Sequence, residues 1–201
     1  AAGALPPYIA SCCASANGDY RAFIYSGKTY LRVYKPGPSV GLPAISATAK
    51  DWRGATISDD GNNIICVAYG EPITYSTDAL ATKATTGSSL NWTGVDSSDD
   101  GTIAIASPYG DYIYESTDSG ANWSSQTGSG SRDWIGCQIS GDGATRIAWT
   151  ATEIYRSTDS GTTWTDITFT GITNILRCGL SPDGNTVLTG NYPGYLYYRT
   201  F

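Results

Sequence analysis

Histidine and methionine are both absent from the 201 residues of this chain, and lysine and arginine together number only 12. Without histidine the protein has no Ser-His or Cys-His nucleophile, and it lacks the usual nitrogen ligand of zinc sites. The net charge of −6 and the scattered basic residues exclude the Lys/Arg surface that nucleic-acid backbones require. We therefore expect no metal, no cofactor and no nucleic-acid partner.

A long apolar run and a starting methionine are also missing. No stretch approaches the roughly 20 apolar residues of a spanning helix, so we expect no membrane span. The chain begins Ala1-Ala2-Gly3, which is what export and removal of a leader would produce. We therefore expect an extracellular protein, or one at a cell or particle surface.

A turn-forming segment recurs five times, and it ends each time in a glycine: Gly18, Gly61, Gly101, Gly143 and Gly184. These glycines are separated by 43, 40, 42 and 41 residues. Apolar and polar residues alternate before each segment, and two more strand-like runs follow it. A period of about 40 to 45 residues with several strands per unit is typical of a β-propeller.

The repeat predicts an all-β fold, a five-bladed β-propeller with four antiparallel strands per blade. The approximate blades are 8–51, 52–91, 92–133, 134–174, and 175–201 together with 1–7. Only 17 residues follow Gly184, so the last blade lacks its outer strand. We expect the N-terminus to supply that strand and close the ring. Because proline cannot donate to a strand ladder, Pro6 and Pro7 confine it to about Ala1–Leu5. A neighbouring subunit could accept it instead, which leaves self-association open.

A second turn in the repeat carries a sharper motif. Residues 116–123 (STDSGANW) and 157–164 (STDSGTTW) match Ser-x-Asp-x-Gly-x-x-Trp, while residues 76–78 keep only Ser-Thr-Asp. These segments resemble the Asp-box, also called the bacterial neuraminidase repeat. In that family the motif forms a hairpin whose Asp closes the turn and whose Trp packs beneath it. The resemblance implies structural roles for Asp78, Asp118, Gly120, Trp123, Asp159, Gly161 and Trp164.

The predicted strand order collects the Asp-rich turns on one face and aromatic side chains on the other. The aromatic candidates are Tyr25, Tyr69, Tyr109, Tyr192 and Trp149 at or near one set of turns, and Trp52, Trp92 and Trp134 at the strand starts. Aromatic rings beside Asp and Asn are the chemistry with which proteins recognise sugars. For the three strand-start tryptophans we favour packing between blades. For the tyrosines, sugar binding and packing between blades are both left open. The Asp-rich turns we interpret as self-capping turns, not as calcium sites.

Catalysis has less support. The eight arginines do not assemble into the triad that the resemblance to sialidases would imply. Asp51, Asp133 and Glu71 could face a channel mouth as glycosidase carboxylates do, but the regular spacing leaves no insertion to build a cleft. We predict a non-catalytic module that binds glycan or an extracellular protein through its aromatic face. The alternatives are a structural subunit of a fibre, coat or appendage and, less favoured, a glycoside hydrolase.

Three of the five cysteines stand three residues before the serine of the first turn: Cys12, Cys137 and Cys178. Small apolar residues fill that position in the other repeats, which indicates buried packing sites. In a closed ring the first and last blades are neighbours. The sequence therefore predicts a disulfide from Cys178 to Cys12 or Cys13, which would stabilise the closing seam by a few kcal/mol.

Overall fold

The computed structural model of the protein describes residues 9–16, 18–25, 31–34 and 50–201. Antiparallel strands make up the fold, and the one helical turn in these ranges is η1 (Thr127–Ser129). The all-β prediction is confirmed. The closing strand predicted at Ala1–Leu5 lies outside the described residues.

The strands form a succession of antiparallel sheets in chain order. The first contains β1 (Ile9–Ala14), β2 (Arg21–Tyr25) and β3 (Leu31–Tyr34). The second contains β4 (Trp52–Ile57), β5 (Ile64–Ser76), β6 (Ala84–Ser97), β7 (Ala104–Asp111), β8 (Ile113–Ser116) and β9 (Ser124–Gln126), with β10 (Arg132–Asp133) paired to β7. The third contains β11 (Gly136–Ile139), β12 (Arg146–Trp149), β13 (Ile154–Ser157) and β14 (Thr165–Asp166). The last contains β15 (Ile175–Leu180), β16 (Thr186–Asn191) and β17 (Leu196–Thr200).

Strand β6 belongs to two sequence repeats at once. Its first part pairs with β5, and from Trp92 onward it pairs with β7. The large sheet therefore consists of two repeats joined through one 14-residue strand. The repeat boundary expected between residues 91 and 92 falls inside this strand.

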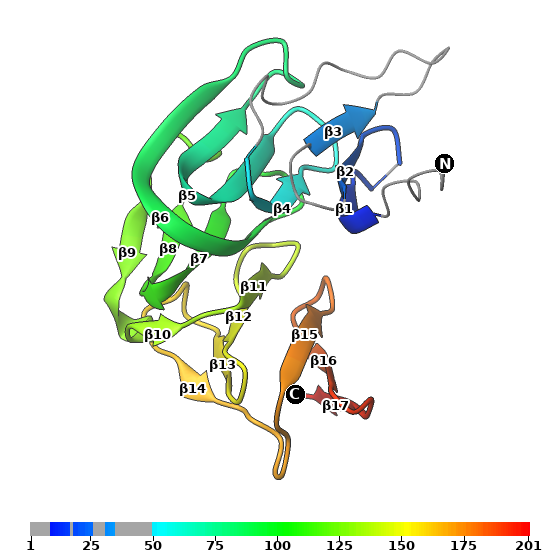
Figure 1. Cartoon of the computed structure of the whole chain (residues 1–201), viewed down its shortest axis with the longest axis vertical. Helices are drawn as coiled ribbons and strands as arrows, with labels where there is room; N and C mark the ends of the chain where they lie inside the picture. The colour runs from blue at the N-terminus through cyan, green and yellow to red at the C-terminus, as the bar shows by residue number, and fades with distance from the viewer. Residues whose placement is uncertain (1–8, 17, 26–30, 35–49) are drawn as a thin grey trace, which may run out of the picture.

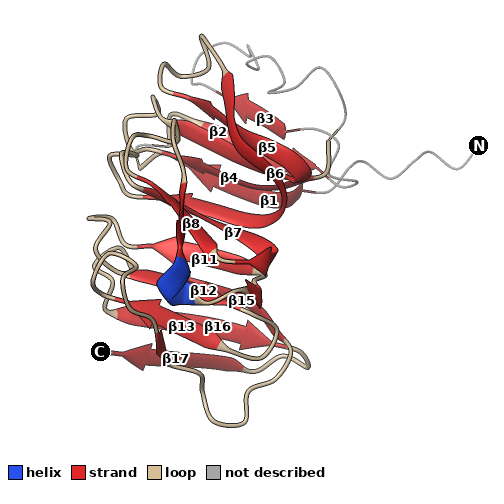
Figure 2. Ribbon diagram, turned by 90° about the vertical axis from the view of Figure 1, so that its left-hand side faces the viewer, coloured by secondary structure: helices blue, strands red, loops and turns tan. Residues whose placement is uncertain are grey.

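The sheets follow one another along an arc, with the first and last sheets on either side of its opening (Figure 1). Viewed from the side, the turns gather along two opposite edges of the molecule (Figure 2). The inner strands of consecutive units lie against each other: β1 on β4, β4 on β6, β6 on β11 and β11 on β15. Within the described residues no pairing joins the first sheet to the last, so the closed five-bladed ring stays a prediction.

Two kinds of contact hold consecutive units together. Apolar clusters fill the junctions, and the large side chains Trp52, Trp92 and Trp134 are buried in three of them. Backbone hydrogen bonds also connect the glycine-ending turn of one repeat to the same turn of the next repeat. The Asp59 N–H donates to the Asp99 carbonyl at 2.7 Å, and the Asp99 N–H to the Gly141 carbonyl at 2.8 Å. From the second unit to the fifth, each described unit is thus fixed to the next at its turn, by the bonds above and by the Gly141 N–H donating to the Pro182 carbonyl.

The first Ser-x-Asp-x-Gly-x-x-Trp segment, residues 116–123, forms the turn between β8 and β9. The Ser116 hydroxyl donates to Asp118 and accepts the Gly120 N–H, each at 2.9 Å. Asp118 accepts the Asn122 N–H at 2.8 Å, and the Trp123 indole donates to the Gly120 carbonyl at 2.9 Å. Hydrogen bonds from the Asn122 side chain and backbone lower the pKa of Asp118. Gly120 has a φ of +90°, a left-handed conformation that glycine adopts without strain.

The second segment, between β13 and β14, repeats this arrangement. Ser157 and Asp159 close the turn, and the Trp164 indole donates to the Gly161 carbonyl at 3.0 Å. Hydrogen bonds from Thr163 lower the pKa of Asp159 to about 2. In the incomplete copy, Asp78 accepts the Thr82 N–H. The residue two places after this Asp is Leu80 instead of glycine, and it adopts the same left-handed region with a φ of +67°.

Candidate functional site

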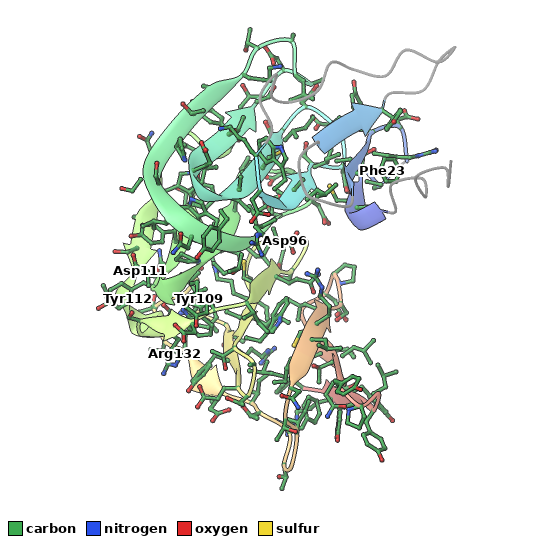
Figure 3. All side chains as sticks on the ribbon, viewed as in Figure 1. Phe23, Asp96, Tyr109, Asp111, Tyr112 and Arg132 are labelled. Atoms are coloured by element: carbon green, nitrogen blue, oxygen red, sulfur yellow. The ribbon has the colours of Figure 1, made fainter. Side chains whose placement is uncertain are left out.

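A groove of about 510 Å³ opens where β7, β10 and the β12–β13 turn meet. Its walls include Tyr109, Arg132, Asp133, Thr150, Ala151 and Glu153. Figure 3 shows Tyr109 and Arg132 on neighbouring strands at this edge. The groove combines one aromatic ring with two carboxylates, a guanidinium and the hydroxyls of Ser131, Thr150 and Thr152.

The end of β7 positions Tyr109. Gly110 turns the chain with a φ of +81°, and the Tyr109 side chain is 51% exposed. The pairing of β7 with β10 places Asp133 opposite Tyr109. A hydrogen bond to the Asp133 carboxylate raises the pKa of Tyr109. The ring is therefore oriented by a carboxylate at its hydroxyl end.

Arg132 forms part of the groove wall. Its guanidinium lies 4.2 Å from the ring centroid of Tyr155 and 5.5 Å from that of Trp134. Its Nε is 4.0 Å from Glu153 Oε2, and an Nη donates to the Ser129 carbonyl. These contacts engage the guanidinium of Arg132. We therefore assign Arg132 a structural role in the groove wall instead of a role in binding an anionic ligand.

The β12–β13 turn that carries Glu153 is fixed by Thr150. The buried Thr150 hydroxyl accepts the N–H of Glu153 at 3.0 Å, and the Thr150 N–H donates to the Glu153 carbonyl at 2.9 Å. At the next position, Ala151 stands eight residues after Gly143. At the same distance after their glycines the second, third and fifth repeats have Tyr69, Tyr109 and Tyr192. The missing ring at Ala151 leaves the space that the groove occupies.

Tyr69 has surroundings of the same kind one repeat earlier. It is 44% exposed and lies opposite Asn91 in the β5–β6 register. Its N–H donates to the Asp51 carbonyl at 2.9 Å, and the Arg53 guanidinium lies 5.0 Å from its ring centroid. Arg53 is in turn paired with the Asp51 carboxylate.

The predicted tryptophans do not reach this surface. Trp52, Trp92, Trp134 and Trp149 are all buried, so none presents a ring to a ligand. Trp149 corresponds by register to the buried Val67 and Ser107, because its partner Gly136 aligns with Gly54 and Gly94. Its ring covers Gly136, where any Cβ would lie about 2.2 Å from the indole. Trp149 instead packs in the cluster that contains Ile154 and Ile175.

Of the remaining tyrosine candidates, Tyr192 is exposed at the β16–β17 turn, while the side chain of Tyr25 lies outside the described residues. The three carboxylates considered for glycoside hydrolysis do not share the groove, since only Asp133 lines it. Asp51 is paired with Arg53, and the Lys50 amine lies 2.9 Å from Glu71. Sequence reasoning missed Thr150 and Ala151. The departure of Ala151 from the Tyr pattern was the available signal.

A second cavity, of about 200 Å³, is lined by the inner strands β1, β4, β6, β11 and β15. Here Asp96 Oδ2 accepts the Ile139 N–H at 3.1 Å, and Gln138 Oε1 accepts the Leu180 N–H at 2.6 Å. Each side chain thus connects its own strand to the next inner strand. Desolvation raises the pKa of Asp96 to about 6.

The cysteines around this cavity are free thiols. The bridge predicted from Cys178 to Cys12 or Cys13 is therefore not formed, because it required the first and last sheets to be neighbours. Cys178 instead contacts the Thr189 hydroxyl at 3.3 Å. Burial raises the pKa of Cys13, Cys137 and Cys178 to about 12, which keeps these thiols protonated and unreactive.

No protein-family model and no curated protein matches this sequence. Among the described residues, no helix is long and apolar enough to cross a membrane. The same part of the chain places no three His, Cys, Asp or Glu side chains so that they could hold a metal ion.

Proposed function

We propose that this protein is a non-catalytic carbohydrate-binding module whose binding site is the groove beside Tyr109. One observation carries the proposal: a half-exposed tyrosine ring is held by Asp133 at the side of an open groove lined by hydroxyls and a second carboxylate. A flat ring covers the C–H face of a pyranose, while carboxylates and hydroxyls bond its hydroxyl groups. Ala151 leaves the room that the sugar would occupy.

The charges of the groove select among sugars. Arg132 is engaged by Glu153 and by the Ser129 carbonyl, whereas Asp133 is exposed. Carboxylates disfavour an anionic ligand in the same groove. We therefore propose neutral or amino sugars as the ligand class, in preference to sialic or uronic acids.

The pairing of Asp51 with Arg53 and of Glu71 with Lys50 supports a binding function over hydrolysis. Glycoside hydrolysis requires two carboxyl groups that flank the same bond. Asp51 and Glu71 are instead neutralised by cations outside the groove. Glu153, the second carboxylate of the groove beside Asp133, is engaged by Arg132.

We further propose that the five repeats are blades of an Asp-box propeller and that the protein acts outside the cell, where polysaccharides are accessible. Three observations support the fold: the regular glycine spacing, the matching hydrogen bonds of the two complete Asp-boxes, and the arc of sheets around a shared cavity.

A glycan array followed by titration calorimetry tests the function. We expect wild-type protein to bind neutral glycans and Tyr109→Ala to lose about tenfold or more in affinity, because the stacking platform is removed. Tyr198→Ala, which removes an exposed tyrosine from the last sheet, is the matched control and should bind as wild type. Absence of glycan binding, or unchanged affinity in Tyr109→Ala, contradicts the proposal.

A second function, a self-associating structural subunit, is favoured by the last sheet. Leu188, Leu196 and Tyr198 are exposed and lie on one face of it. An apolar face of this kind commonly marks a protein–protein interface. Sedimentation velocity over a concentration series tests this function. Association that Leu196→Asp abolishes supports it, and a monomer at every concentration rejects it.

A further inference from the structure

The large sheet places two exposed tyrosines in line along one edge. Tyr69 of β5 pairs with Asn91 of β6, and the next residue of β6, Trp92, pairs with Pro108 of β7. Tyr109 directly follows Pro108 on β7. The two tyrosines therefore lie on either side of β6, at the point where this strand passes from pairing with β5 to pairing with β7.

Their spacing follows from sheet geometry. Neighbouring strands lie about 4.8 Å apart, so β5 and β7 are roughly 10 Å apart across β6. The phenol of Tyr69 is close enough to contribute to the raised pKa of Tyr109, after the larger effect of Asp133. One pyranose ring cannot cover both tyrosines at this spacing, whereas a short chain of pyranoses can.

Each tyrosine is accompanied by polar groups that suit sugar hydroxyls. Asp133 stands beside Tyr109. Tyr69 has the Asn91 backbone opposite it and the ion-paired Asp51 and Arg53 beside it. Two exposed tyrosine rings, one beside Arg53 and one beside Asp133, thus follow one another toward the groove.

We propose that Tyr69 and Tyr109 are consecutive subsites for one extended, neutral oligosaccharide that crosses β6 between these two tyrosines and enters the groove at Ala151. This inference rests on the proposed carbohydrate-binding function. Tyr109 and the groove hold one end of the chain, and Tyr69 supplies affinity only for ligands that are long enough to reach it.

Calorimetry with cello-, malto- and manno-oligosaccharides, from the monosaccharide to the hexasaccharide, tests the inference. In the series that binds, the affinity of wild-type protein should rise about tenfold or more with chain length and then level off. Tyr69→Ala should lose this gain while it keeps the affinity for the shortest ligand. Tyr69→Phe, which retains the ring, should keep the gain, and Tyr109→Ala should weaken every ligand. Circular dichroism of each variant checks that the fold is intact.

The possible failures are distinguishable. If no oligosaccharide of any length binds, the proposed function and this inference fall together. If binding occurs but the affinity does not depend on chain length, or Tyr69→Ala binds long ligands as wild type does, only the extended site is rejected.

Discussion

The third sheet and the last sheet are built from the same repeat, but their faces meet different surroundings. In the third sheet, β12 has all four of its residues buried. In the last sheet only one face is covered, because Val187 and Thr189 are buried while Leu188 between them is exposed. Tyr198, which pairs with Leu188, is 74% exposed. In repeat proteins each unit buries its surface against the adjacent units. Among the described residues, the third sheet packs between two other sheets, whereas this face of the last sheet is exposed.

The connections between inner strands differ in the same way. Asp96 and Gln138 each accept an N–H from the next inner strand. The corresponding position in the last repeat is Gly179, which has no side chain to extend such a bond. The turn bonds that run from Asp59 through Gly141 end at Pro182, which has no N–H to donate. Two residues therefore end the series of connections at the last sheet.

The largest effect is expected from the buried junctions. Trp134→Ala should lower the free energy of unfolding by ~3–5 kcal/mol, because it leaves a cavity between the second and third sheets. Tyr198→Ala, on the free face of the last sheet, should change it by less than ~0.5 kcal/mol. Urea denaturation measures both. A comparable loss in the two variants would show that the free face is covered in solution.

A buried ion pair gives the next effect. Arg146 is 1% exposed and pairs with Glu115 across the second and third sheets. Arg146→Ala should lower the free energy of unfolding by about 3 kcal/mol, because it leaves the buried Glu115 carboxylate without its cation. The value lies at the lower end of the usual range because Gln126 still donates to Glu115 at 2.7 Å. Arg177→Ala, an exposed arginine of the last sheet, is the control and should leave the urea midpoint almost unchanged.

The turn between β8 and β9 should contribute less. Ser116→Ala removes the acceptor of the buried Gly120 N–H and should cost about 1–2 kcal/mol in thermal or urea unfolding. Ser125→Ala, on the exposed strand that follows the turn, should have no measurable effect. Equal stability of the two variants would mean that the turn does not depend on its serine.

The last prediction is a pH dependence. The pKa of Asp96 is about 6 in the folded protein against an ordinary value of 3.8, so the folded state binds this proton more tightly than the unfolded state does. Its contribution to stability is therefore greatest in acid and is lost as the pH rises from about 4 through 6. Asp96→Asn keeps an acceptor for the Ile139 N–H and should flatten this part of the stability profile. An unchanged profile would place the titration elsewhere.

The sequence predicted the strands and turns better than the surroundings of the sheets. Alternation and the regular glycines identified the all-β class, and the Ser-x-Asp-x-Gly-x-x-Trp segments form hydrogen-bonded turns between strands. The disulfide was wrong because it depended on contact between the first and last sheets, a long-range feature that local patterns do not encode. The sequence also predicted a repeat boundary between residues 91 and 92, where β6 is in fact one continuous strand. The pattern of strand-forming residues does not show whether such a segment is one strand or two.

The candidate site was predicted in part. Tyr69 and Tyr109 stand at turn positions and are exposed, as expected. The sequence placed Trp149 on the same surface because it lies near the turn. Trp149 stands two residues before Ala151, the position equivalent to Tyr69 and Tyr109, and its side chain is buried. The groove has the small residue Ala151 in its wall, where other repeats have tyrosine. Because alanine has no reactive or polar side chain, the sequence carries no chemical signal at this position.

Ala151→Tyr tests most directly whether the groove beside Tyr109 is the glycan-binding site. This exposed position would acquire the residue that the second, third and fifth repeats carry, and the new ring would fill the groove without disturbing the core. Calorimetry with the best-bound neutral glycan should show that binding is lost while the urea midpoint stays at the wild-type value. Wild-type affinity in Ala151→Tyr would contradict the assignment of the groove as the binding site.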